Sequence, residues 1–414
     1  MNILDTLNSR IKDNSSELDK WFEKHHENIL IPLYSSVDIR VSKNKIVPVD
    51  TNIFPAGFNN ISENFRINTG KLFRNSLSNK YPGAKKILIV PELHTKNAYY
   101  WENIYVIKSM LENEDYEVRI GIVSDNFEKE HVVFTTISGS ELDAWKAKSR
   151  GNKIVLDDFI PDIILLNNDF SEKCPKTLRD IVQPVVPPVE MGWHTRRKDV
   201  NFDFYNSLAA EVADIIGIDP WTINIETCLV ENINFDNPDD RKRASECAKK
   251  VMSSITAKYN ELKITDEPTI FIKSNSGTYG MAVISIKDIE SLILMNSSNR
   301  KRLRVTKGGA PVRDVVIQEG VPTVFKTKDS SSAEPVIYMV EDSVAGVFYR
   351  VNSEKSDSDN LNSKGMRFEP FENTVNEIDT IPEVFTLVSK IAVIAAGYEI
   401  EKIIRDGGCK EAVS

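Results

Sequence analysis

Apolar and polar residues along the chain fall into patterns that predict both strands and helices. Residues 35–54 alternate in two short runs on either side of Ser42-Lys43-Asn44, which predicts two strands joined by a turn. The continuous apolar run over residues 85–93 is typical of a buried parallel strand. A helical pattern over residues 98–111 and a strand-like run over 117–123 follow it, so this region predicts a βαβ unit.

The rest of the chain mixes helices with strands of antiparallel type. Helices are expected over residues 3–22, 201–216 and 239–258, from residue 288 onward, and from a Thr380-Ile-Pro-Glu383 capping box to Gly407-Gly408. Strands are expected over residues 162–168, 269–273, 281–286, 315–321, 335–340 and 345–351. The predicted fold class is α/β plus α+β, in four parts: residues 1–60, 84–200, 201–325 and 326–414.

Composition narrows the class of protein. A length of 414 residues suggests two or three domains of about 150 residues each, and 41% hydrophobic with 27% charged residues is ordinary for a globular chain. No apolar run approaches the roughly 18 residues of a membrane helix, and the first residues lack the apolar core of a secretory signal. The net charge of −9 provides no electrostatic reason for binding nucleic acid.

The cysteine pattern predicts neither a disulfide scaffold nor a zinc site. The four cysteines are widely spaced and form no CxxC pair: Cys174, Cys228, Cys247 and Cys409. This spacing is too sparse for a disulfide scaffold or a zinc site and fits a reducing cytoplasm. Cys247 lies on the apolar face of a predicted helix, where we expect a core residue.

A loop of small residues follows the strand that ends at Lys273. Residues 274–280 read SNSGTYG, and the backbone N–H groups of such a loop can close around phosphate oxygens while Lys273 adds a positive charge. The loop is neither a Walker loop nor a Rossmann turn, because no GKS or GKT ends it and a strand follows it. Strand, loop and strand suit a flap over a nucleotide; a plain β-turn is the alternative.

A second strand end offers groups for a nucleoside. The strand that ends in Gln318-Glu319-Gly320-Val321 presents two adjacent backbone amides and a carboxylate, which can bind adenine and ribose. A strand that simply leaves the core is the alternative.

Hard oxygen ligands gather at two strand ends near the N-terminus: Asp38, Asp50, Asn52 and Asn59. Magnesium prefers one or two carboxylates together with nucleotide phosphates. Because side chains two apart on a strand face the same way, Asp50 and Asn52 can reach one ion. Asx-turn chemistry is the alternative.

Two polar stretches stand out on otherwise apolar surroundings. Residues 92–97 (ELHTKN) come directly after the first βαβ strand, where α/β proteins place ligand sites. Residues 190–205 (EMGWHTRRKDVNFDFY) set His194, Arg196, Arg197 and Lys198 between aromatic residues. Cationic groups there could hold a substrate carboxylate, arginine in a bidentate manner.

Together these stretches resemble the ATP-grasp glutamate–cysteine ligases of proteobacteria. The matching motifs run in family order from about residue 35 to residue 368: SSVDIR, KIVPVDTNIFPAGFNN, ELHTKNAYYW, PPVEMGWHTRRKDVNFDFYN, FIKSNSGTYGMAV, VVIQEGVPT, YRVN and NLNSKGMRF. Two positions depart from the expected pattern: Lys96 stands in place of an arginine, and Ser363-Lys364 replaces a different pair.

The resemblance implies an ATP-grasp fold preceded by a βαβ domain, and an ATP-dependent ligation. The γ-carboxylate of L-glutamate would be phosphorylated, and the amine of L-cysteine would attack the acyl phosphate to give γ-glutamylcysteine, the first step of glutathione biosynthesis. The implied cofactors are ATP and Mg²⁺, and the implied location is the cytoplasm. Neither nucleic acid nor a membrane is expected as a partner, and a homo-oligomer is left open.

The resemblance also assigns roles to residues. Lys273 would neutralise the α- and β-phosphates, and Arg350 would stabilise the transferring phosphoryl group. The nucleotide would contact Ser276, Gly277, Thr278, Gly280, Gln318, Glu319 and Val321. The substrates would contact Asn59, His94, Lys96, Asn97, His194, Arg196 and Arg197.

The order of elements suggests a circular permutation. ATP-grasp enzymes similar to glutathione synthetase carry a carboxylate strand and a Glu-x-Asn strand after their last long helix, whereas here residues 35–60 have that order of elements. We expect residues 35–60 to complete the C-terminal sheet and to supply Asp38, Asp50 and Asn52 as magnesium ligands.

Two other functions stay open from the sequence. Another ATP-grasp carboxylate–amine ligase, such as a glutathione synthetase-like enzyme, would share the phosphate chemistry and differ only in the motifs that face the substrates. A non-catalytic nucleotide-binding regulator would be expected to lack some of Lys273, Arg350, Asp50 and Asn52, and all four are present.

Overall fold

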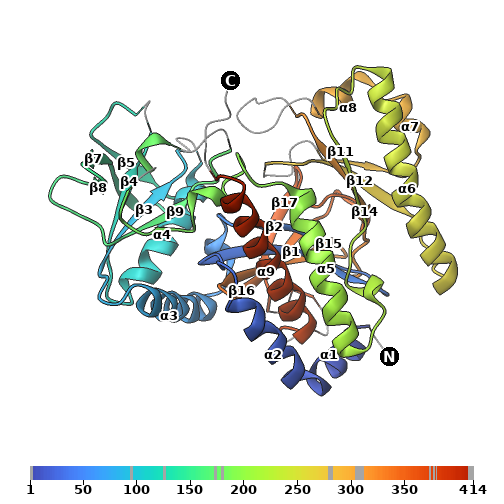
Figure 1. Ribbon diagram of the computed structural model, residues 1–414, viewed down its shortest axis with the longest axis horizontal. Helices are drawn as coiled ribbons and strands as arrows, with labels where there is room; N and C mark the ends of the chain where they lie inside the picture. The colour runs from blue at the N-terminus through green and yellow to red at the C-terminus, as the bar shows by residue number, and fades with distance from the viewer. Residues whose placement is uncertain are drawn as a thin grey trace.

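Three β-sheets of four to six strands and one two-stranded sheet organise the part of the chain that the structure describes (Figure 1). The computed structural model describes residues 3–93, 97–124, 127–171, 175–178, 181–277, 283–303, 312–372, 374–375, 378 and 380–408. Short 3-10 helices connect the larger elements: η1 (Phe58–Asn60), η2 (Lys176–Leu178), η3 (Val189–Met191) and η4 (Pro220–Thr222). The fold class predicted from the sequence, α/β plus α+β, is confirmed.

The first sheet has six strands in the order β10-β9-β3-β4-β6-β5 and is mostly parallel. Its strands are β3 (Lys86–Pro91), β4 (Glu117–Ile122), β5 (His131–Thr135), β6 (Glu141–Lys146), β9 (Ile163–Asn167) and β10 (Val185–Val186). Helices α3 (Glu63–Lys80) and α4 (Ala98–Glu112) lie beside it, and β7 (Lys148–Arg150) pairs with β8 (Lys153–Val155) as a separate hairpin. The predicted βαβ unit is therefore present as β3, α4 and β4.

The second sheet has four antiparallel strands in the order β11-β14-β12-β13. They are β11 (Thr227–Val230), β12 (Thr269–Ser274), β13 (Val283–Ile286) and β14 (Val315–Gly320). Helices α6 (Pro238–Leu262), α7 (Glu290–Ile293) and α8 (Ser297–Arg302) accompany this sheet at one end of the molecule (Figure 1).

The third sheet joins the two ends of the chain. Its five antiparallel strands run in the order β17-β16-β15-β1-β2. They are β1 (Tyr34–Val41), β2 (Ile46–Asn52), β15 (Ser332–Val340), β16 (Ser343–Asn352) and β17 (Met366–Pro370). β1 pairs with β15, as the permutation hypothesis requires, whereas the predicted domain boundaries stay a prediction.

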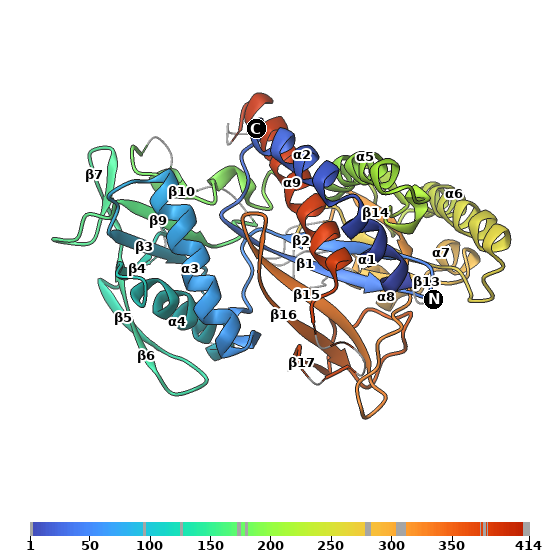
Figure 2. The same cartoon turned by 90° about the horizontal axis from the view of Figure 1, so that it is seen from below.

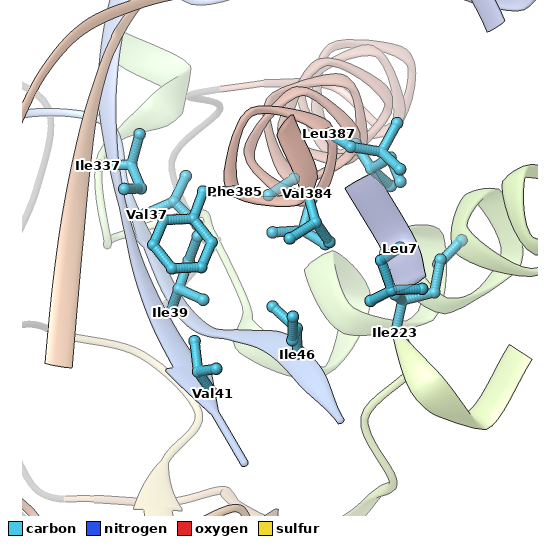
Figure 3. Packing of buried hydrophobic residues seen from close by; sticks show 14 of the residues in the cluster. Leu7, Val37, Ile39, Val41, Ile46, Ile223, Ile337, Val384, Phe385 and Leu387 are labelled. Atoms are coloured by element: carbon cyan, nitrogen blue, oxygen red, sulfur yellow. The ribbon is translucent and has the colours of Figure 1, made fainter. Parts of the chain in front are cut away.

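Four helices cover one face of this five-stranded sheet (Figure 2). They are α1 (Ile3–Asp13), α2 (Ser15–His26), α5 (Lys198–Ile216) and α9 (Glu383–Arg405). Val37 and Ile39 of β1 point toward Phe385 of α9 in the close view of this core (Figure 3), and all three side chains are fully buried. Alternate residues of β1 thus supply a large apolar core that anchors the sheet.

A β-bulge separates the two halves of the β1–β2 ladder. Asp38 pairs with Asp50, but the next residue, Ile39, pairs with Pro48. Val49 is therefore the extra residue of β2, and it has no partner in the ladder. Because paired residues point to the same face of a sheet, Asp38 and Asp50 share the face opposite α9.

The structure corrects four details of the sequence interpretation. Helix α9 has no side-chain cap from the predicted Thr380 box: its N-cap is Pro382, and Asn8 of α1 accepts a hydrogen bond from Val384 N instead (3.1 Å). The first helix is divided into α1 and α2, and the helix expected from residue 288 is the four-residue α7.

The fourth correction concerns the cysteines. Cys228 of β11 and Cys247 of α6 form a disulfide with a Cα–Cα distance of 6.0 Å. Cys247 is buried in the core of this region, as predicted, whereas the cysteine spacing gave no indication of this disulfide. A sequence separation of 19 residues contains no local signal for the pairing.

Candidate active site

A cavity of about 70 Å³ lies between the four-stranded and the five-stranded sheet. Both sheets, α5 and the segment after β16 contribute to its wall. The lining residues are Asp38, Arg40, Val49, Asp50, Lys198, Phe271, Lys273, Ser274, Gly277, Val283, Gln318, Glu319, Val321, Glu334, Arg350, Asn360 and Asn362. Most of the residues predicted for the nucleotide and the metal therefore share one wall, although they come from three distant segments.

A buried charge cluster forms the part of this wall contributed by the five-stranded sheet. Arg350 of β16 donates to both carboxylate oxygens of Asp38 (2.8 and 3.2 Å) and to Glu334 Oε1 (2.6 Å). Glu334 also forms an ion pair with Arg40 of β1. Two arginines and two carboxylates therefore neutralise one another in a place where an unpaired charge would be very costly.

The neighbours of these groups determine their protonation. Burial raises the pKa of Asp38, and the nearby carboxylates of Glu334 and Asp50 add to that rise against the effect of Arg350. Burial alone would lower the pKa of Arg350, but Asp38 and Glu334 raise it, so the guanidinium stays charged. Burial also opposes ionisation of Glu334, yet Arg40 and Arg350 lower its pKa.

Two lysines approach Asp50 from different elements. Lys198, the first residue of α5, donates to Asp50 Oδ1 (2.5 Å) and lies over the ring of Trp193 (4.4 Å to the centroid). Lys273 of β12 donates to the carbonyl of Val49, the extra residue of the bulge (2.9 Å). Burial disfavours the charged form of Lys273 and lowers its pKa to about 8, against the opposing effect of Asp50.

The carboxylate of Asp50 stays ionised between these lysines. Burial would raise the pKa of Asp50, but Lys198 and Lys273 lower it. The Asp–Lys arrangement leaves this end of the cavity with two ammonium groups and one carboxylate from strands and a helix that are far apart in the sequence.

The other end of the cavity contains polar atoms without partners. Both the Nε2 and the Oε1 atom of Gln318 are buried without a hydrogen bond, and so is Oε1 of Glu319. The second carboxylate oxygen of Glu319 accepts from Lys45 Nζ (2.6 Å) and from Glu226 N (3.2 Å). Lys45 is itself buried over the ring of Trp221 (4.3 Å to the centroid).

The loop after β12 is anchored to helix α5. Asn275 accepts from Lys198 N at its carbonyl (2.8 Å) and from Asp199 N at its side chain (3.0 Å). Gly277 lines the cavity with a φ of +100°, which favours glycine. Ser276 is half-buried and does not line the cavity, and the predicted Thr278 and Gly280 lie outside the described residues.

The predicted substrate residues that are described lie away from this cavity. Arg196 is buried, donates twice to Glu399 of α9 (2.9 and 3.0 Å) and once to the carbonyl of Thr51 (3.2 Å). Arg197 donates to Glu399 through its backbone N–H (3.1 Å) and to the carbonyl of Arg196 through its guanidinium (2.7 Å). The pair therefore ties the start of α5 to α9 and β2 instead of facing a ligand in this cavity.

Of the five other predicted substrate residues, three have local partners and two lie outside the described residues. Asn97 caps α4 by accepting from Tyr100 N (3.2 Å), and His194 Nδ1 lies 3.1 Å from the carbonyl of Phe170. Asn59 contacts Asn60 (3.3 Å) and does not line the cavity. His94 and Lys96 are outside the described residues.

Asn52 stands apart from the two aspartates predicted with it. It pairs with Ser36 at the end of β2 and does not line the cavity, although its side chain shares the face of Asp50. Among the described residues, no group of three or more His, Cys, Asp or Glu side chains has the arrangement of a metal site.

Five charged or amide residues of the cavity and its support were not predicted for the site: Arg40, Lys45, Glu334, Asn360 and Asn362. Lys198 was predicted as a cation for a substrate carboxylate and lines this cavity instead. Arg40 and Glu334 lie in strands whose residues are all buried. Charged residues are almost never fully buried unless they are paired, so charge inside such a strand is a usable signal. Asn360 and Asn362 lie in a polar segment with no pattern of its own.

None of the described helices combines the length and the apolar content that crossing a membrane requires.

Comparison with known proteins identifies the family. A family model described as GshA, glutamate-cysteine ligase, matches residues 8–400. The crystal structure of a candidate gamma-glutamylcysteine synthetase from Methylobacillus flagellatus KT is 31% identical and superimposes with a TM-score of 0.87 over 96% of both chains. A search among curated proteins gave no match.

More distant solved structures are also similar. A D-cycloserine synthetase, DcsG, is 9% identical with a TM-score of 0.40 over 76% of this chain and 82% of its own. D-alanyl-alanine synthetase A from Vibrio cholerae O1 biovar eltor is 10% identical with a TM-score of 0.37 over 77% of this chain and 81% of its own. Similarity at this level carries no argument about function.

The family match answers the question that the sequence left open between an enzyme and a regulator. It confirms the interpretation as a ligase of glutathione biosynthesis, and the glutathione synthetase-like alternative is not favoured. The two antiparallel sheets that close on one cavity agree with the ATP-grasp arrangement that the resemblance implied. This chain belongs to the glutamate–cysteine ligase family.

Proposed function

We propose that this ligase uses ATP to activate the γ-carboxylate of L-glutamate for attack by the amine of L-cysteine. A carboxylate oxygen takes the γ-phosphoryl group and ADP leaves; the amine then forms the amide bond as phosphate leaves with the amine proton. The observation that carries the proposal is the single cavity that collects Lys273, Asp50, Arg350 and the strand end 318–321. Phosphoryl transfer requires such positioning and charge neutralisation more than covalent chemistry.

The unpartnered atoms of Gln318 and Glu319 support the nucleoside end of the ATP site. A buried amide or carboxylate oxygen without a hydrogen bond costs about 1–3 kcal/mol, which a ligand can recover. An adenine ring and ribose hydroxyls offer the donors and acceptors that these atoms lack. Gln318, Glu319 and Val321 would therefore hold the nucleoside, as the resemblance implied.

The charges at the opposite end support the phosphates. Lys273 would neutralise the α- and β-phosphates, and Arg350 would stabilise the transferring phosphoryl group. Lys198, which the sequence analysis did not assign to the nucleotide, adds a second ammonium group beside Asp50. The loop with Ser276, Gly277, Thr278 and Gly280 would cover the phosphates.

The cavity walls also fit a divalent cation. Asp38 and Asp50 lie side by side on adjacent strands and point to the same face, and Mg²⁺ in nucleotide enzymes needs only one or two carboxylates besides phosphates. Asp38 and Asp50 would hold Mg²⁺, with Asn52 next along the same face. The ion would neutralise phosphate charge when bound.

Other parts of the interpretation stay predictions. We propose that Asn59, His94, Lys96, Asn97 and His194 face the amino acid substrates when these are bound. The buried pairing of Arg196 and Arg197 with Glu399 supports a structural role for both instead. We also propose that the protein is cytoplasmic and that its partners are small molecules, with neither nucleic acid nor a membrane among them. A homo-oligomer is left open.

We also propose that the chain is circularly permuted relative to glutathione synthetase-like enzymes. The pairing of β1 and β2 with β15 supports this, because it puts an N-terminal hairpin in the sheet that the C-terminal strands build.

A cavity of about 70 Å³ is small for this ligand. Sites for small molecules usually have about 300–1,000 Å³. We therefore expect the four-stranded sheet to move away from β2 when ATP enters, with the contact between Lys273 and the Val49 carbonyl exchanged for a phosphate contact.

The direct test is phosphate release from ATP with glutamate alone, with cysteine alone and with both. We expect turnover only with both amino acids and γ-glutamylcysteine as the product by mass spectrometry. Equal turnover with an unrelated pair of amino acids would contradict the proposed substrates.

The metal assignment has its own test. Isothermal titration of the Asp50→Asn variant with Mg²⁺ and a non-hydrolysable ATP analogue should show binding that no longer depends on the metal as in the wild type. Wild-type metal dependence together with full turnover would rule out Asp50 as a ligand.

A further inference from the structure

Residues 353–364, between β16 and β17, form a polar segment that we call the asparagine loop. Asn360 and Asn362 of this loop line the cavity, as does Val283 of β13. The side chain of Asn360 accepts from Asn362 N (3.0 Å), which holds the two asparagines in a fixed relation.

Arg40 attaches this loop to the charge cluster. Its Nε forms the ion pair with Glu334, and its two remaining nitrogens donate to loop carbonyls: Nη1 to Asp357 (2.8 Å) and Nη2 to Asp359 (2.7 Å). The guanidinium is buried, and each of its three nitrogens has a different partner. Its planar geometry lets one side chain hold these partners in one arrangement, which a lysine cannot do.

The end of β16 holds the other side of the loop. The Asn352 side chain is fully buried; it accepts from Glu354 N (3.0 Å) and donates to the carbonyls of Leu361 and Lys364 (3.3 Å each). The loop is therefore fixed at both ends, and its two asparagines are presented to the cavity by an arrangement of buried hydrogen bonds.

The position of the loop along the cavity indicates which part of a ligand it meets. The Asp357 carbonyl also accepts from Thr323 N (3.0 Å), two residues beyond Val321. Arg40 pairs with Val47 on the side of the hairpin that leads to Lys45 and its partner Glu319. The loop therefore lies beside residues 318–321, the strand end that was assigned to the nucleoside. Along β1 it lies at Arg40, away from the pair of Asp38 and Asp50.

From this geometry we propose that Arg40 is a positioning residue and that Asn360 and Asn362 hydrogen-bond the nucleoside part of the bound nucleotide. The proposal deepens the proposed function and rests on it. An asparagine amide both donates and accepts, which matches the hydroxyl groups of a ribose. The phosphates and the amino acids are the ligands of the other end and are not contacted by this loop.

The test compares three variants by steady-state kinetics and by calorimetric titration with ADP and with AMP-PNP. Arg40→Lys keeps the charge beside Glu334 but loses the directed hydrogen bonds to the loop. The double variant Asn360→Ala/Asn362→Ala removes the contacts themselves from half-buried positions, where folding is not at risk. Ser358→Ala, in the same loop but not lining the cavity, is the matched control.

We expect the variants to change the KM for ATP and to leave kcat nearly unchanged. In Arg40→Lys and in the asparagine double variant, the KM for ATP should rise about tenfold, the equivalent of one hydrogen bond of about 1.4 kcal/mol. In both, kcat and the KM values for the amino acids should stay within about twofold. The affinities for ADP and AMP-PNP should fall by the same factor, because both contain the same nucleoside. Ser358→Ala should behave like the wild type.

Two results would overturn the proposal. One is a loss of kcat in Arg40→Lys with an unchanged KM for ATP, since that would assign Arg40 to the phosphoryl group. The other is unchanged affinity for ADP in the asparagine double variant. A wild-type enzyme that is inactive with glutamate and cysteine would contradict the proposed function. The titration with ADP would still test the role of the loop, because it needs no turnover.

Discussion

Strand β1 of the five-stranded sheet is buried on both faces, and the chemistry of its two faces differs. On one face, Val37 and Ile39 pack under α9; on the other, Asp38 and Arg40 form ion pairs at the cavity. Every residue of β1 is buried, so burial alone does not distinguish the two faces. One strand therefore contributes to folding stability through its odd-numbered residues and to the candidate active site through its even-numbered residues.

The largest effect that tests this comparison is a loss of folding stability on the charged face. Glu334→Ala removes the carboxylate shared by Arg40 and Arg350 and leaves two buried cations with Asp38 alone. We expect the free energy of unfolding in urea to fall by about 3–5 kcal/mol. Glu369→Ala on β17 is the control: its pair with Arg367 is partly exposed, and the loss should stay below about 1 kcal/mol. Equal losses in the two variants would show that the cluster is not acting as a buried network.

The second effect separates activity from stability on the same face. Lys273→Met should lower kcat/KM for ATP by about 100- to 1,000-fold, because a charge that stabilises phosphoryl transfer is lost. The free energy of unfolding should not fall, because burial already disfavours the ammonium and lowers its pKa to about 8. Phosphate release and urea unfolding measure the two quantities. A destabilised variant with normal kcat/KM would reverse the assignment.

The third effect tests the apolar face. Ile39→Val removes one methyl group from the core under α9 and should cost about 0.5–1.5 kcal/mol of stability. Kinetic constants for all three substrates should stay at the wild-type values, because the side chain points away from the cavity. A changed KM for ATP would indicate that the two faces are coupled through the backbone of β1.

The smallest effect is a dependence of folding stability on pH, and it arises among the helices that cover the apolar face of the five-stranded sheet. His25 of α2 lies between Tyr398 (2.7 Å) and Glu211 (3.7 Å), and burial lowers its pKa below 6.5 against the opposing effect of Glu211. The unfolded chain therefore binds a proton more readily than the native one just below pH 6.5, so stability falls as the pH decreases through that range. His25→Gln should reduce the difference in melting temperature between pH 7.5 and pH 5.5. An unchanged difference would mean that other groups carry it.

Much of the fold follows from local patterns, and the exceptions have physical causes. The strands around Lys273 and Arg350 and the helix α9 were predicted because their apolar periodicity is strong. Strands β5 to β8 were not, since several of their residues are exposed and the alternation is weak. The Thr380 box failed because Asn8, which lies 376 residues away from Val384, provides the cap.

The candidate site was predicted where a residue type alone suggests its chemistry. Asp38, Asp50, Lys273, Arg350 and the strand end 318–321 meet in the cavity. The arginines of residues 196–197 have the right chemistry for a carboxylate, but the carboxylate they meet is Glu399 on a distant helix. Partners that come from remote segments are not visible in one sequence, and the roles of Arg40 and Glu334 depend on such partners.

The unpaired Val49 shows how much can depend on one inserted residue. If Val49 were paired like its neighbours, the side chains of Pro48 and Asp50 would lie on the same face of the sheet. Asp50 would then point into the apolar core beneath α9. The insertion rotates it by half a turn and leaves a main-chain oxygen for Lys273. Deleting Val49 would make this ladder regular with Asp38 still opposite Asp50, so the aspartate would keep its place and Lys273 alone would lose its main-chain anchor.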